Sequence, residues 1–137
     1  MNPAPMPYVT ALYAGIIILL LLVLAVPISR LRGKTRIGLG DGGNPDLARA
    51  IRTHANLSEW GVPVLFLMLV AELNRAPLAM LHVAGIVLVA ARLLHAFGLS
   101  RSGGASFGRK YGAGLTWLVL VVLALWNIWA FVRLALR

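Results

Sequence analysis

The chain contains no cysteine, which excludes disulfides, thiolate metal sites and a cysteine nucleophile. Acidic residues are scarce too, because only four Asp and Glu stand against thirteen Lys and Arg, for a formal net charge of +9. Charged residues are 12% of the 137, about half the share in a soluble domain. A chain this poor in charge, 60% hydrophobic with a mean hydropathy of +0.85, is predicted to be an integral membrane protein.

The apolar residues fall into four segments, each able to supply the roughly 20 residues that cross about 30 Å of hydrocarbon. The segments predict helices over about 8–29, 46–74, 77–99 and 110–136. They lack the alternation of barrel strands, so the predicted fold class is all-α, a bundle of four transmembrane helices in a single domain over 1–137. Asn44 or Asp46 is expected to cap the second helix, whose first turns are polar up to Trp60.

Basic residues gather in two of the three connections. Four lie within residues 30–36 and three within 101–110, both of which are expected to be loops. Cytoplasmic loops carry an excess of Lys and Arg, so these two connections are predicted to be cytoplasmic and both termini to lie outside. Membrane topology and contact with anionic lipid then explain the positive charge, and no nucleic-acid partner is predicted.

The second segment carries a stripe of three polar residues that indicates a functional site. Arg52, Asn56 and Glu59 are spaced i, i+4 and i+7, so on a helix they fall within roughly 60° of arc. A carboxylate near hydrocarbon costs about 2.5–3.5 kcal/mol and is tolerated when it has a partner and faces other helices or a wet cavity. Two interpretations stay open. The ions neutralise each other, or the stripe forms one wall of a polar pocket open to the cytoplasm.

The third and fourth segments supply further walls for such a pocket. Arg92 and His95 share a helix face, and Arg92 stays protonated and needs an anionic partner, for which Glu59 is the internal candidate. Arg109 and Tyr111 stand near a helix N-terminus, where backbone N–H groups and the macrodipole favour an anion. The set is positively charged, so the predicted ligand is a small polar anion, with a second substrate that arrives through the lipid.

Two other kinds of site are less well supported. A metal site would need His54, His82 and His95, but no two of these have the i, i+4 spacing of a helical ligand pair, so no metal is predicted. A small multidrug exporter couples protons through a carboxylate in its first helix, and the first segment here contains no acid. Glu72 is the other intramembrane carboxylate, and it is expected at a helix end beside Asn74.

Residues 40–44 (GDGGN) and 50–59 (AIRTHANLSE) resemble the membrane-associated proteins in eicosanoid and glutathione metabolism, the MAPEG family, and its bacterial branch in particular. The resemblance covers essentially the whole chain. Its Arg-x-x-x-Asn-x-x-Glu pattern is fairly specific, and Arg92 with His95 agrees with it. The resemblance implies a homotrimer in a bacterial inner membrane, with glutathione bound as co-substrate in cytoplasm-facing sites between neighbouring subunits.

The resemblance also implies roles for individual residues. Arg109 is the predicted catalytic residue, the arginine that stabilises the glutathione thiolate. The contacts with glutathione that the resemblance implies are Arg52, Asn56, Glu59, Arg92 and His95. The residue types themselves add Lys34 and Arg36 of the first loop, which can help to bind the carboxylates, and Tyr111, whose phenol can donate and accept hydrogen bonds. The predicted activity is a glutathione S-transferase or peroxidase-like reaction on a lipophilic electrophile.

An alternative is a non-enzymatic membrane scaffold that binds lipid or another small anion. Three departures from other branches of the family favour it. Ala55 replaces a second basic residue, and Leu99 and Lys110 replace a tyrosine and a serine of the prostaglandin-synthase branch. These departures count against prostaglandin synthesis.

Overall fold

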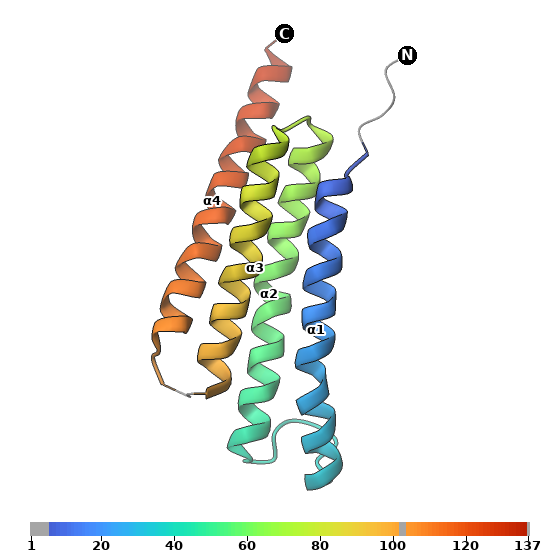
Figure 1. The fold of residues 1–137 in the computed structure, drawn as a ribbon, viewed down its shortest axis with the longest axis vertical. Coiled ribbons are helices and arrows are strands. Elements are labelled where there is room, and N and C mark those ends of the chain that lie inside the picture. Colours follow the sequence, from blue (N-terminus) through green and yellow to red (C-terminus); the bar gives the residue numbers. More distant parts are fainter. Residues whose placement is uncertain (1–5, 102–103, 137) are drawn as a thin grey trace.

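The computed structural model describes residues 6–101 and 104–136 and contains four long helices in an antiparallel, up-down-up-down bundle (Figure 1). The helices are α1 (Tyr8–Thr35), α2 (Pro45–Leu73), α3 (Leu78–Arg101) and α4 (Phe107–Ala135). Each is long and apolar enough to cross a membrane, which confirms the all-α class and the four predicted spans. The start of α1, the α2–α3 turn and the end of α4 lie at one end of the bundle.

Three helices extend beyond the apolar runs that predicted them. α1 continues past residue 29 to Thr35, so most of the basic stretch expected in a loop is helical. At the other connection, α3 reaches Arg101 and α4 begins at Phe107 rather than near residue 110. The apolar run marks the part of a helix in hydrocarbon, whereas Arg and Lys are good helix formers and let the helix continue into the polar layer.

Side chains that cap the helices define where α2 and α4 begin. The Asn44 side-chain oxygen accepts hydrogen bonds from the backbone N–H groups of Asp46 and Leu47, each at 3.0 Å, which confirms Asn44 as the cap. The Ser106 hydroxyl accepts from the Arg109 N–H at 3.4 Å. These bonds satisfy backbone donors that the first turn of a helix leaves without partners. The Ser106 cap thereby fixes Arg109 in the first turn of α4.

The two central helices, α2 and α3, hold the bundle together. α1 packs against both of them, α4 packs against both of them, and α1 and α4 have no contact along the parts described. The core consists of fully buried side chains from all four helices, among them Ile17, Val64, Met68, Leu88 and Leu123. The outer surfaces of α1 and α4 expose large apolar side chains, as expected for surfaces that face lipid.

Glu72 joins the end of α2 to the start of α1. Its carboxylate accepts the backbone N–H groups of Val9 at 2.9 Å and Thr10 at 2.7 Å, and the residue is only 5% exposed. A carboxylate at a helix N-terminus satisfies orphan donors and interacts favourably with the helix dipole. The acid considered for proton coupling therefore serves as an anchor between two helices.

Glycines allow α3 and α4 to approach closely at the end of the bundle that holds the basic loops. A Cβ atom added at Gly112 would lie 2.6 Å from the Ala91 carbonyl oxygen and 2.8 Å from the His95 nitrogen. One added at Gly108 would lie 2.5 Å from the Leu94 carbonyl oxygen. These neighbours are backbone atoms, so they cannot move aside without separating the helices.

Substitution of Gly112 by alanine is expected to destabilise the protein, although alanine favours helix by about 0.5–1 kcal/mol over glycine. Overpacking against backbone costs about 1–3 kcal/mol and outweighs that gain. Gly114→Ala is the matched control, because no atom lies within 4 Å of its added Cβ. Thermal unfolding in detergent should show a lower Tm for G112A and an unchanged or higher Tm for G114A. Equal Tm values would contradict the close contact.

Candidate functional site

Arg92 lies at the centre of the polar part of the bundle and links three helices. Its guanidinium donates one hydrogen bond to the Asn56 side-chain oxygen of α2 at 3.0 Å and another to the Gly112 carbonyl oxygen of α4 at 2.9 Å. The residue is 2% exposed, and its Nε has no acceptor among the residues that the structure describes. Over the described residues, no carboxylate lies within ion-pair distance of this guanidinium. A buried cation is thus held by neutral groups alone.

The predicted partnership of Arg92 with Glu59 is wrong. Glu59 instead pairs with Arg52, whose Nη1 lies 3.0 Å from the carboxylate oxygen. The i, i+7 spacing places both on an exposed face of α2, where their side chains are 59% and 47% exposed. The stripe therefore contains a self-neutralised pair at the surface and one inward residue, Asn56. An exposed pair of this kind is worth only about 0–1 kcal/mol, so an incoming ligand can separate it at little cost.

His95 and Arg109 line a common cavity of about 290 Å³ between α3 and the start of α4. The other lining residues are Ala105, Ser106, Lys110 and Ala113. His95 is buried and Arg109 is partly buried, with its Nη1 donating to the Gly104 carbonyl oxygen at 2.6 Å. The carbonyl that accepts from Arg92 belongs to Gly112, next to the cavity residue Ala113. Arg109 and Lys110 thus line a recess at the N-terminus of α4, and Arg92 lies next to it. The positive charge and the helix N-terminus together favour the binding of an anion there.

Three other predicted site residues are not brought to this cavity. Lys34 and Arg36 are exposed at the end of α1, and neither lines the cavity. Tyr111 is also exposed, and its ring stacks on Phe107 with the centroids 4.2 Å apart. Conversely, sequence reasoning missed Ser106 and the Gly112 carbonyl. A serine just before an apolar helix is a usual N-cap and was a usable signal for Ser106, whereas a backbone carbonyl leaves no signal in the sequence.

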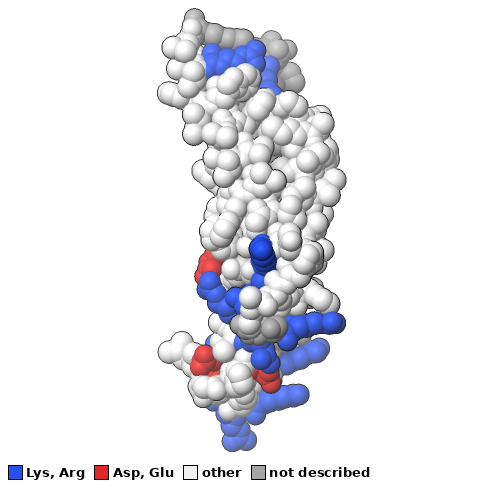
Figure 2. Space-filling view, turned by 90° about the vertical axis from the view of Figure 1, so that its left-hand side faces the viewer, with Lys and Arg blue, Asp and Glu red and all other residues white. Residues whose placement is uncertain are grey.

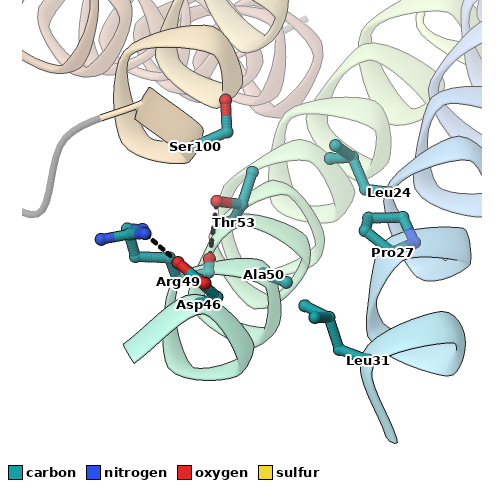
Figure 3. Close-up of a pocket in the computed structure, with 8 residues that line it drawn as sticks. All are labelled: Leu24, Pro27, Leu31, Asp46, Arg49, Ala50, Thr53 and Ser100. Carbon is teal, nitrogen blue, oxygen red and sulfur yellow. Dashed lines mark hydrogen bonds and ion pairs between the residues drawn. The ribbon is translucent and has the colours of Figure 1, made fainter. Parts of the chain in front are cut away.

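A second recess, of about 200 Å³, lies between α1 and α2 near the basic end (Figure 3). Its charged residues, Arg49 and Asp46, point toward each other and form an ion pair. The Thr53 hydroxyl donates to the Arg49 carbonyl oxygen at 2.8 Å, and Leu24 and Leu31 of α1 supply an apolar wall. Because Arg49 and Asp46 neutralise each other, this recess has no net charge that would attract an anion.

The three histidines considered as metal ligands are not brought together. His82 lies beside Tyr13, with its Nδ1 3.1 Å from the phenol oxygen, at the opposite end from His95. Within residues 6–101 and 104–136, no group of three or more His, Cys, Asp or Glu side chains is placed to hold a metal ion.

Charge is distributed along the bundle as expected for a membrane protein. Seen from the side on which α4 lies, Lys and Arg gather at both ends, mostly at the basic-loop end, with a broad band of other residues between (Figure 2). The smaller group, at the other end, contains Arg75 and Arg133. The band between the two groups matches the hydrocarbon layer that four apolar helices require.

Comparison with known proteins identifies the family. The model of the MAPEG family matches residues 10–129, which include parts of all four helices and every candidate site residue named above. The chain belongs to the MAPEG family. It is 40% identical over 121 residues to the inner membrane protein YecN of Escherichia coli K12, an alignment that covers 88% of this chain and 91% of YecN. YecN of Escherichia coli O6:H1 matches equally well.

Membership in the MAPEG family confirms the resemblance noted in the second helix and the integral membrane character of the protein. The family includes glutathione-dependent enzymes, and the relatives are inner membrane proteins whose name assigns no activity. The choice between an enzyme and a scaffold therefore depends on the chemistry of the site itself.

Proposed function

We propose that this MAPEG protein binds glutathione at the basic end of the bundle and delivers its thiolate to a lipophilic electrophile, as a glutathione S-transferase or peroxidase-like enzyme. The observation that supports this most is the burial of Arg92 with only neutral partners, next to a cavity that Arg109 lines. Burying an unpaired charge is costly, and a bound anion repays that cost. Glutathione supplies two carboxylates and a thiol that ionises to an anion.

Each polar residue then has a distinct task. The Arg92 guanidinium, oriented by Asn56, attracts one carboxylate toward the recess. The exposed pair opens so that Arg52 binds the second carboxylate and Glu59 binds the ammonium group of the ligand. Arg109, at the N-terminus of α4, faces the sulfur and favours thiolate over thiol. Lowering the pKa of a thiol by two units takes about 2.7 kcal/mol of differential stabilisation.

We further propose that the site is completed by a second copy of the chain in a homotrimer. The outer face of α2 exposes Arg52 and Glu59 and, further along, Val62, Pro63 and Phe66. A partner packed on this apolar part would place its own residues over the ion pair and enclose a ligand there. The excess of Lys and Arg at the same end of the bundle supports a cytoplasmic location for the site, with both termini outside.

Isothermal titration of the detergent-solubilised protein with glutathione tests the binding step. We expect saturable heat and a Tm that rises with ligand concentration, by the equivalent of about 2.7 kcal/mol at 100 times Kd. S-methylglutathione is the matched control, because it keeps both carboxylates and lacks the ionisable thiol. It should bind without being a substrate. No heat and no change in Tm at millimolar glutathione would contradict the proposal.

A non-enzymatic anion-binding scaffold is the second candidate, and the self-neutralised Arg52–Glu59 pair favours it. An assay with a chlorinated nitrobenzene separates the two functions. In the enzyme, the thiolate sulfur bonds to the ring carbon and chloride leaves. Binding of glutathione without formation of the thioether from this or any other electrophile tested would favour the scaffold.

A further inference from the structure

Two cavities, together called the crevice, follow each other along α4 in the half of the bundle remote from the basic loops. A cavity of about 340 Å³ opens at the end, against Arg75, Trp126, Trp129 and Arg133. A second cavity of about 350 Å³ follows toward the middle, between Ala79, Val83 and Val87 of α3 and Leu118 and Val122 of α4. The α4 positions 122, 126, 129 and 133 repeat at intervals of three and four, so they form one stripe along the helix.

The cavity at the end of the bundle is cationic and lacks an acid. Arg75 and Arg133 are exposed, and over the residues that the structure describes neither forms an ion pair. The Arg133 guanidinium lies 5.3 Å from the centroid of the Trp129 ring. The indole N–H of Trp126, in the same wall, is buried and finds no acceptor in the described chain. Two cations and the ring of a tryptophan therefore border one opening at membrane-headgroup depth.

The cavity in the middle is lined by apolar side chains alone. From Pro77 to Val87 the crevice follows ten residues of chain, about 15 Å of helix rise. One leaflet supplies half of the roughly 30 Å of hydrocarbon, so the crevice is as deep as one leaflet. The closest approach of α3 and α4, through Gly108 and Gly112, lies near their other ends.

We propose that this crevice is a binding site for an anionic glycerophospholipid. The phosphate lies between Arg75 and Arg133, and one acyl chain extends along the apolar part toward Val87. Charge complementarity selects an anionic headgroup over a zwitterionic one. The apolar depth selects a lipid over a free phosphate ion. The site lies at the opposite end of the bundle from the proposed glutathione site and is independent of it.

Native mass spectrometry of the full-length protein, delipidated in detergent, tests the proposal. Phosphatidylglycerol and phosphatidylcholine with identical acyl chains are added at matched concentrations. We expect one phosphatidylglycerol per chain, held about tenfold more tightly than phosphatidylcholine, and a higher Tm with the former. Glycerol 3-phosphate, which has the headgroup chemistry without acyl chains, should neither bind nor compete. Equal retention of the two lipids, or competition by glycerol 3-phosphate, would overturn the lipid assignment.

Two sets of variants locate the lipid. R75Q together with R133Q should reduce phosphatidylglycerol binding about tenfold, whereas R30Q together with R101Q, two exposed arginines at the other end, should leave it unchanged. V122W fills the apolar part from a side chain that is 44% exposed, and it should displace both lipids. Unchanged lipid binding in R75Q/R133Q, or cross-linking of Val83→Cys to the same residue of a second copy, would show that lipid does not occupy the crevice.

Discussion

Substitution of Arg109 by alanine is expected to lower glutathione turnover about 25-fold at pH 7 and by less than about twofold at pH 9. A thiol of ordinary pKa, about 8.5, is about 3% ionised at pH 7, whereas one lowered to about 6.5 is about three quarters ionised. Removing the cation raises the pKa again, so the loss of thiolate is large below the higher value. At pH 9 both forms are mostly ionised, and the difference nearly vanishes.

The measurement is the pH profile of conjugation between pH 6 and pH 9.5 at saturating glutathione. Arg109→Lys keeps the charge and should recover part of the activity at pH 7. Arg101→Ala is the control, because Arg101 is an exposed arginine at the end of α3, stacked 3.9 Å from the Phe97 ring centroid. The Arg109 side chain also bonds to Gly104, so Tm is recorded for each variant. A loss in Arg109→Ala that is the same at every pH would assign this residue to binding or to the loop.

The fold could be predicted from the sequence because hydrocarbon leaves little choice. Apolar runs of about 20 residues must form helices, since a backbone in lipid has to satisfy its own hydrogen bonds. The same argument fails beyond the membrane surface, where the predicted end of the first helix is wrong. Residues 30–35 were assigned to a loop because they are basic, yet they continue α1. Hydropathy measures transfer into lipid, and it does not mark the end of a helix in water.

In the candidate site, contacts within one helix could be predicted from the sequence, and contacts between helices could not. Spacing along one helix correctly placed Arg52 and Glu59 on a common face, where they form an ion pair. The partners of Arg92 lie 36 and 20 residues away, and one of them is a backbone carbonyl. That carbonyl is within reach because Gly112 brings α4 against α3. Which backbone atoms meet depends on how whole helices pack, and no local pattern encodes it.

Glu72 illustrates the limit for charged groups. The sequence showed an acid near a helix end, and a carboxylate in the membrane usually indicates function. Its partners are the backbone N–H groups of Val9 and Thr10, 63 and 62 residues away. Backbone donors are present at every helix start, so composition cannot reveal which start an acid will cap. A membrane carboxylate is therefore evidence of a needed partner, and the partner decides whether the role is structural or chemical.

Substitution of Arg92 by methionine is expected to abolish most glutathione binding while leaving the ligand-free protein as stable as the wild type, or more so. Methionine occupies a similar volume without a charge, and replacing buried ions by apolar residues is often neutral or stabilising. Loss of one charge-assisted hydrogen bond to the ligand weakens binding roughly 10- to 150-fold. The Gly112 carbonyl still accepts from the Thr116 hydroxyl at 2.8 Å, so it is not left without a donor.

The alternative is that Arg92 serves only to join three helices, and this alternative predicts the opposite change in Tm. If Arg92 is a structural link, Arg92→Met lowers the ligand-free Tm and leaves the glutathione-induced rise in Tm intact. Asn56 loses its donor in that variant, so R92M/N56L, which removes both partners, gives the cleaner comparison. We expect the double variant to have the highest ligand-free Tm of the set and no response to glutathione. That result would mean that Arg92 lowers the stability of the ligand-free protein and is kept because it binds the anionic ligand.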